Sequence, residues 1–130
     1  MVQAPGRCGG GGSRLPRARR ITRGREIRAL FQRGKRSRTA HLDVFDFASP
    51  VAHPRLGVVV PKHKHSGVER NRLKRRLREI LRREVMPRLD AAGLNLDVLV
   101  RARREAYGAG FSELAAELTH WMEKRCSRAP

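Results

Sequence analysis

The stretch at residues 70–83, which reads RNRLKRRLREILRR, places the strongest constraint on the fold. Its apolar residues recur at the spacing of a helix with one buried face: Leu73, Leu77, Ile80 and Leu81. At about 100° per residue, polar side chains gather on the opposite face: Asn71, Arg75, Arg78 and Arg82. The segment therefore predicts a helix that packs its apolar side on a domain and presents guanidinium groups on its outer side.

This arginine-rich face indicates a polyanionic partner. Glu79 is the only acidic residue between Arg70 and Arg83, so the i,i+4 ion pairs that usually neutralise a helix face are nearly absent. The whole chain has 30 Lys and Arg residues against 12 Asp and Glu residues, a formal net charge of +18. Planar guanidinium groups suit phosphate oxygens, so nucleic acid is the expected partner.

Composition and patterning argue against membrane and secreted classes. No apolar run approaches the roughly 18 residues that span a bilayer, and the basic, glycine-rich residues 1–14 have no apolar signal region. The chain is therefore expected to be cytoplasmic and to bind no membrane. Cys8 and Cys126 lie near opposite ends, which predicts reduced thiols and no disulfide framework.

Apolar periodicity predicts the order helix, strand, strand, helix, strand, helix. Strands are expected at residues 42–47, 55–60 and 96–101. Expected helix boundaries are a Thr22 cap, a Gly34 stop, a stop of the arginine-rich helix near Pro87, and a Ser112 cap on the last helix. The strands on either side of the arginine-rich helix form a β-α-β unit, so they should lie parallel in one sheet.

Several motifs between Arg55 and Glu79 resemble those of the protein subunit of bacterial ribonuclease P. These are Arg55-Leu56-Gly57, a turn with Lys62, the helix start Arg70-Asn71-Arg72 with Lys74-Arg75, and Leu77-Arg78-Glu79. The resemblance extends over about residues 15–125 and is specific, because the spacing from Arg55 to Arg72 matches without a gap. There are two departures. The turn reads Pro61-Lys62-His63-Lys64-His65-Ser66 in place of a Ser-Lys-Lys turn with a following Gly-Asn, and Ile27 stands where the family often has Phe.

The resemblance implies an α+β fold, an α/β two-layer sandwich of the α-β-β-β-α-β-α type. It implies a sheet of about four strands and an unusual left-handed β-α-β crossover, whereas right-handed crossovers are the general rule. The single domain is expected at residues 15–126, between a disordered Gly/Arg-rich tail at 1–14 and a short tail at 127–130.

Two sets of site residues follow from the resemblance. The set expected to bind the RNA subunit is Arg70, Asn71, Arg72, Lys74, Arg75, Arg76 and Arg78. The set expected to line a cleft for the single-stranded 5′ leader is Ile27, Phe31, Phe45 and Lys62. Apolar residues at i and i+4, such as Ile27 and Phe31, equally fit packing in the core.

The implied activity is hydrolysis of one phosphodiester bond, which releases the 5′ leader from precursor tRNA. The catalytic RNA subunit and its magnesium ions are implied to carry out the chemistry, and the protein to bind leader and RNA and to lower the magnesium requirement. No catalytic residue, protein-held metal, organic cofactor or obligate protein partner is expected. His63 and His65 have no evident third metal ligand nearby.

Three alternatives come from other classes. A small ribosomal-type RNA-binding protein fits the net charge equally well, although the spacing from Arg55 to Glu79 argues against it. A free-standing protein ribonuclease would need a nucleophile and base held together. A helix-turn-helix DNA-binding protein is disfavoured, because the arginine-rich helix lies between strands and does not follow another helix.

Overall fold

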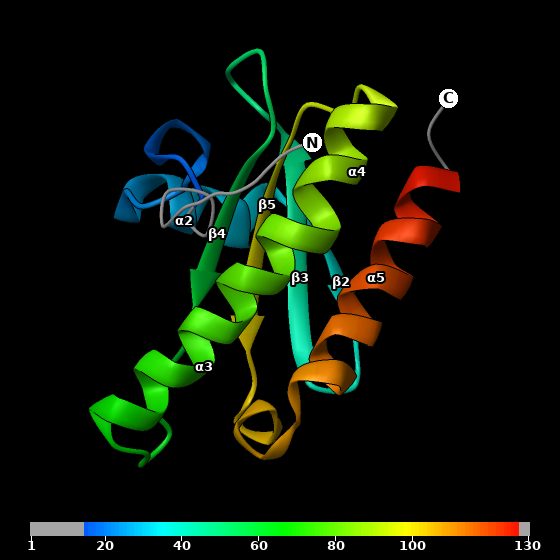
Figure 1. The fold of residues 1–130 in the computed structure, drawn as a ribbon. Helices are drawn as coiled ribbons and strands as arrows, with labels where there is room; N and C mark the ends of the chain where they lie inside the picture. The colour runs from blue at the N-terminus through cyan, green and yellow to red at the C-terminus, as the bar shows by residue number, and fades with distance from the viewer. Residues whose placement is uncertain (1–14, 128–130) are drawn as a thin grey trace.

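The computed structural model describes residues 15–127, so the predicted tail at 1–14 and residues 128–130 lie outside the described residues. The elements in chain order (Figure 1) are η2 (Arg17–Arg19), α2 (Gly24–Arg33), β2 (Lys35–Arg38), β3 (Leu42–Ala48), β4 (Arg55–Val59), α3 (Gly67–Ile80), η3 (Leu81–Val85), α4 (Met86–Ala92), β5 (Leu96–Ala102), η4 (Arg104–Gly108) and α5 (Phe111–Ser127).

The strands form one mixed sheet with the order β2-β3-β5-β4. β3 pairs antiparallel with β2 and β5, whereas β4 and β5 are parallel, as the β-α-β unit predicted. The four-stranded α+β fold is thus confirmed, and the left-handed sense of the crossover stays a prediction. β2 reads KRSR, so no apolar alternation indicated it, and only the resemblance implied a further strand.

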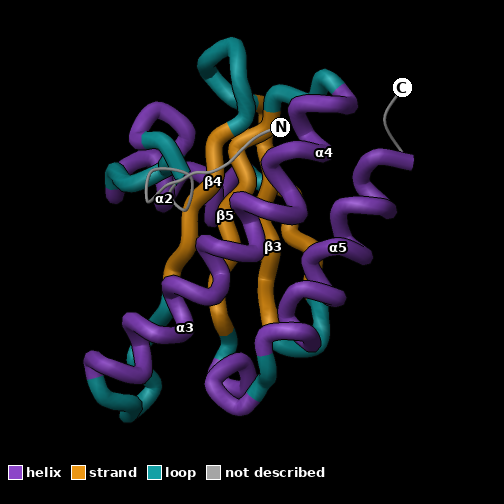
Figure 2. Tube along the Cα trace, in the orientation of Figure 1, coloured by secondary structure: helices purple, strands orange, loops and turns teal. Residues whose placement is uncertain are grey.

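Helices α3, α4 and α5 cover one face of the sheet (Figures 1 and 2), and the main core lies between them and the strands. The residues that alternate toward this face are buried: Leu42, Val44, Leu56, Val98 and Val100. The apolar side of the arginine-rich helix is buried against them, as its periodicity predicted: Leu73, Leu77, Ile80 and Leu81.

A smaller core lies on the other face of the sheet, where α2 packs. Its buried members are Ile21, Leu30, Phe45 and Leu99, with Ile27, Phe31 and Val59 packed against them. Gly57 allows residues 20–21 to approach β4, because a Cβ there would lie 2.9 Å from Leu99 Cδ1 and 3.1 Å from Ile21 Cβ. The Ile21 N–H donates to the Leu56 carbonyl oxygen at 2.8 Å, which fixes this approach.

Three predicted helix boundaries are wrong. The arginine-rich helix does not stop near Pro87 but continues to Ala92 through η3, a wider π-helical turn in which the Met86 N–H donates to the Leu81 carbonyl. Pro87 is tolerated because it lies in the first turn of α4, and Gly93 (φ 67°) ends the helix.

The remaining two errors concern N-caps. Arg23, which makes no side-chain capping bond, precedes α2, so Thr22 is not the cap. Ser112 lies inside α5, where the Glu113 carboxylate accepts from the Gly110 N–H at 3.0 Å. A hydroxyl residue near a helix start therefore does not by itself identify the N-cap, because its side chain must also reach a free N–H of the first turn.

Candidate RNA-binding surface

The start of α3 is fixed by a reciprocal capping box. The Ser66 Oγ accepts from the Glu69 N–H at 3.1 Å, and the Ser66 N–H donates to the Glu69 carboxylate at 2.9 Å. This pattern satisfies two N–H groups that would otherwise lack partners in the first turn. The helix therefore begins at Gly67 and places the Arg-Asn-Arg block in its first two turns.

The turn that precedes α3 is held from the side by η4. The ring of His65 stacks on Tyr107, with centroids 3.8 Å apart and planes within 6°. The Tyr107 hydroxyl donates to the Pro61 carbonyl oxygen at 2.7 Å. His63 and Lys64 have positive φ angles of 48° and 71°, a conformation that non-glycine residues adopt uncommonly and that these flanking contacts maintain. Lys62, from the predicted leader set, is exposed in this turn.

The predicted RNA-binding residues come together on the outer side of α3, here called the α3 cationic face: Arg70, Asn71, Arg72, Lys74, Arg75, Arg76 and Arg78. Asn71, Arg72, Arg75 and Arg78 are exposed, while the other three are partly buried. Arg70 has a structural role as well, since its Nε donates to the Val60 carbonyl oxygen at 2.7 Å.

No cation of the α3 cationic face forms an ion pair within the described residues 15–127. Glu79 instead pairs with Arg82 at 2.8 Å and, at 4.0 Å, with Arg83. Burial, with Arg78 and Arg70 close by, lowers the pKa of Lys74 below its ordinary value. Arg78 is exposed as a whole, but partial desolvation and the neighbouring Arg20 likewise lower its pKa. The face is a concentration of like charge that no ion pair among the described residues neutralises.

A groove of about 860 Å³ runs along this face. Asn71, Lys74, Arg75 and Arg78 line it together with Arg20, which the sequence analysis did not select. Arg20 reaches the groove because the segment before α2 runs alongside β4, where Arg20 bridges to Leu56. The basic cluster Arg17, Arg19 and Arg20 was the only sequence feature that could have indicated this role. The pairing of Arg20 with Leu56 that places it in the groove joins residues far apart in the sequence.

The aromatic members of the predicted leader set meet on the other face of the sheet. The rings of Phe31 and Phe45 lie edge to face, with centroids 5.0 Å apart. The Arg101 guanidinium carbon lies 5.1 Å from the Phe31 centroid and 5.4 Å from that of Phe45. Phe45 is only 4% exposed, so Phe31 and Arg101 provide the accessible part of this cluster. Ile27 is half-buried and lines a separate hollow with Gly57 and Lys74.

A buried carboxylate that the sequence analysis missed organises the arginines beside this cluster. Asp43 is 1% exposed and lies 3.1 Å from Arg101, 3.4 Å from Arg36 and 3.5 Å from Arg103. Burial raises the pKa of Asp43, but the Arg101 and Arg36 contacts outweigh burial and hold it below the ordinary value. Register places Asp43 opposite Arg101, a relation that no local pattern encodes.

Within residues 15–127, no three His, Cys, Asp or Glu side chains are grouped so that they could hold a metal ion. In the same range, no helix is both long and apolar enough to cross a membrane.

A family model described as Ribonuclease P matches residues 15–126. The chain belongs to the ribonuclease P protein family. The ribonuclease P protein component of Desulfovibrio desulfuricans is 34% identical over 122 residues, covering 89% of each chain. That of Thermus oshimai is 45% identical over 75 residues, which span 58% of this chain and 45% of that protein.

The fold agrees with this ribonuclease P assignment. The structure of the Staphylococcus aureus RNase P protein superposes with a TM-score of 0.69, covering 84% of this chain and 96% of that chain. Its sequence identity is 23%, so it supports the fold only. The motif from Arg55 to Glu79 thus identified the correct family.

Proposed function

We propose that the chain is the non-catalytic protein subunit of a ribonuclease P that removes the 5′ leader from precursor tRNA. Family membership makes it a component of this tRNA-processing ribonucleoprotein. The observation that supports a direct role in RNA binding is the α3 cationic face, whose cations have no ion-pair partners within the described residues. A polyanion would relieve their mutual repulsion.

In this proposal the α3 cationic face binds the RNA subunit. Exposed arginines can approach phosphate oxygens in bidentate geometry, and Asn71 can both donate and accept hydrogen bonds. Each phosphate neutralised by the protein releases condensed counterions from the RNA. Protein cations would thereby replace part of the ion atmosphere, so the complex would need less magnesium. Magnesium itself would be held by the RNA subunit and the substrate.

The leader of precursor tRNA would lie beside α2 and the sheet. Phe31 offers a partly accessible ring, and Arg101 lies across it as a second planar group. Stacking of bases on such groups contributes about 1–3 kcal/mol per base and tolerates any sequence. The buried ring of Phe45 would hold the ring of Phe31 in place through their edge-to-face contact. The exposed Lys62 would contact the backbone phosphates of the leader. Sequence-tolerant contacts suit a subunit that serves many precursors.

The deciding experiment is cleavage of precursor tRNA at low magnesium, with the full chain and a bacterial ribonuclease P RNA added singly and together. Cleavage at the mature 5′ end only in the combined reaction is the expected result. Cleavage by the protein alone would overturn the proposal in favour of a free-standing protein ribonuclease. Failure to stimulate any compatible RNA would favour a ribosomal-type RNA-binding protein.

Two further expectations accompany this function. The complex should require no second protein, which reconstitution from purified chain and RNA would test directly. The chain should be cytoplasmic, where precursor tRNA is processed in bacteria, and fractionation of cells that express it would test that location.

A further inference from the structure

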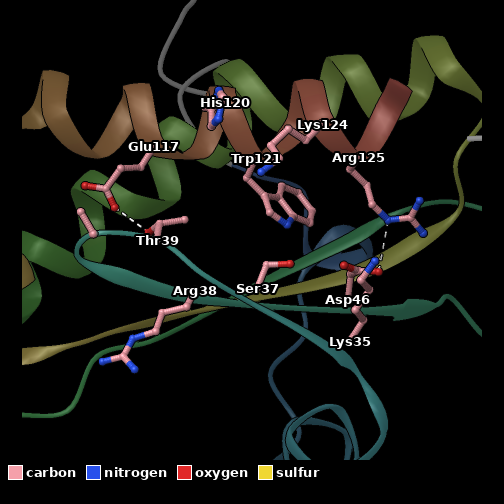
Figure 3. A pocket seen from close by; sticks show the side chains of 11 residues that line it. Lys35, Ser37, Arg38, Thr39, Asp46, Glu117, His120, Trp121, Lys124 and Arg125 are labelled. Atoms are coloured by element: carbon pink, nitrogen blue, oxygen red, sulfur yellow. Dashed lines mark hydrogen bonds and ion pairs between the residues drawn. The ribbon is translucent and has the colours of Figure 1, made fainter. Parts of the chain in front are cut away.

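A second cavity lies away from the α3 cationic face, between β2 and α5. It has a volume of about 270 Å³ and is here called the α5–β2 pocket. Glu117, His120, Trp121, Lys124 and Arg125 line it from one side of α5, and Lys35, Ser37, Arg38, Thr39, Ala40 and Asp46 line it from the strands and the β2–β3 turn (Figure 3). β2 is the sheet edge opposite β4, so this pocket is separate from the groove beside α3.

The pocket contains a buried carboxylate oxygen without a hydrogen-bond partner. Asp46 is 4% exposed, and its Oδ2 atom accepts no hydrogen bond from the described residues. Its Oδ1 atom accepts from the Arg125 Nε at 3.4 Å, a long contact. Buried polar atoms are nearly always satisfied, so an unpartnered anionic oxygen on a side chain that lines a cavity is left to accept a hydrogen bond from a bound group.

The other carboxylate of the pocket is already engaged. Glu117 accepts from the Thr39 hydroxyl at 2.6 Å and from the His41 N–H at 3.0 Å, and its other oxygen pairs with the His41 ring. Asp46 Oδ2 is therefore the carboxylate oxygen of the pocket that is left for a ligand. Cationic side chains surround it, including Lys35 and Lys124, so the ligand should combine an N–H or O–H donor with a negative charge.

This combination excludes some simpler ligands. A group that only accepts hydrogen bonds would meet the Asp46 carboxylate, and an amine or guanidinium would meet the surrounding cations. A nucleotide has both required parts, because each base carries an N–H donor and the phosphate is anionic. The pocket is slightly smaller than the roughly 300–1,000 Å³ of typical small-molecule sites, which suits one inserted base.

We propose that the α5–β2 pocket binds a single unpaired nucleotide of an RNA, with a base N–H donating to Asp46 Oδ2 and the phosphate beside Lys35 and Lys124. Carboxylates accept from base N–H groups in many protein–nucleic acid complexes. Trp121 points from α5 toward the strands in Figure 3 and forms a wall of the pocket. The proposal rests on the RNA-binding function above but assigns RNA a second contact, on another surface.

Trp121 is the only tryptophan of the chain and lines the pocket, so a single indole N–H signal in an NMR spectrum of the full-length protein reports on this site without overlap. The probes are 5-methyluridine 5′-monophosphate and 3-methyluridine 5′-monophosphate. These isomers have equal size and charge, but methylation at N3 removes the only N–H of the base. Ribose 5-phosphate is the probe without a base.

The 5-methyl isomer should shift the indole signal to saturation, and the 3-methyl isomer should bind roughly 5- to 150-fold more weakly, the range of one good base contact. Ribose 5-phosphate should produce no saturable shift. Equal affinities for the isomers, a saturable shift with ribose 5-phosphate, or no saturable shift at all would each overturn the proposal.

Asp46→Asn should reduce the preference between the isomers, and its thermal unfolding serves as the folding control. If this variant does not fold, the comparison of isomers on the wild-type protein decides alone. Arg72→Ala with Arg75→Ala should weaken binding of the RNA subunit but leave the isomer preference unchanged. If the wild-type protein binds the RNA subunit but shows no isomer preference, the pocket proposal fails. If it shows the isomer preference but does not bind the RNA subunit, the proposed RNA-subunit function fails.

Discussion

Replacing Arg72 and Arg75 together with alanine should weaken binding of ribonuclease P RNA and flatten its dependence on salt. Both side chains are exposed on α3 and have no ion-pair partner within residues 15–127. If each contacts one phosphate, the slope of log K against log salt should fall by about 0.7–0.9 per residue, so by about 1.4–1.8 for the pair. The assay is a titration of labelled RNA at several salt concentrations.

The loss of affinity follows from the same relation. At about 0.1 M salt, one contact with a slope of about 0.8 corresponds to roughly a 6-fold change, and two contacts to roughly 40-fold. Stability should change little, by about 0.5 kcal/mol or less, because neither side chain is buried or bonded. A large loss of affinity with an unchanged melting temperature would therefore be an interface effect.

The matched control is Arg83→Ala with Arg88→Ala, which removes the same net charge. Arg83 lies 4.0 Å from Glu79, and Arg88 lies 3.6 Å from Glu123, so each already has a carboxylate nearby. This control should lower the slope by clearly less than the α3 pair. Equal slopes for the two double variants would show that only total charge matters, and an unchanged slope for the α3 variant would remove that face from the interface.

Three further predictions test other parts of the structure. Phe31→Leu should weaken binding of leader-bearing precursor by about 1–3 kcal/mol per stacked base without a matching loss for mature tRNA; equal losses in a paired titration would indicate a packing defect instead. Ser66→Ala should lower the unfolding free energy by about 0.5–2 kcal/mol in chemical denaturation, because it removes the α3 cap. The low pKa of Asp43 stabilises the fold above its unfolded pKa, and this stability should be lost as pH falls below about 4. Asp43→Asn should therefore cost about 2 kcal/mol at neutral pH and make stability less dependent on acid; an unchanged acid profile would contradict this.

The parts of the fold that were predictable are those with a local periodic signal. The apolar spacing of Leu73, Leu77 and Ile80 identified α3 and its buried side, and alternation in residues 42–47 assigned Leu42 and Phe45 to opposite faces. β2 carries no such alternation. The π-helical turn that lets the helix pass Pro87 depends on packing of η3 in the core, where Leu81 and Val85 are buried, so a local rule placed the helix end too early.

The candidate site likewise has a part that local sequence predicts and a part that depends on long-range pairing. The α3 cationic face lies on one helix, so its residues share a face by spacing alone. The Asp43 cluster and the Asp46 pocket combine residues from distant elements, and sheet register brings them together, as in the pairing of Asp43 with Arg101. The local sequence around Asp43 or Asp46 resembles any strand with an acidic residue, so neither role was visible before the strands were paired.

The positions of the buried acids explain how so basic a chain can fold and still keep an uncompensated cationic surface. A net charge of +18 opposes folding through repulsion. All of the buried carboxylates among the described residues lie on strands, and each contacts arginine: Asp43 as above, Asp46 with Arg125, and Asp97 with Arg55 in a bidentate pair at 2.6 and 2.9 Å. Charge is therefore neutralised around the sheet. The cations of the α3 cationic face form no ion pair within residues 15–127, and the first-turn acid Glu69 is engaged in the Ser66 capping box, so uncompensated positive charge is concentrated on this helix.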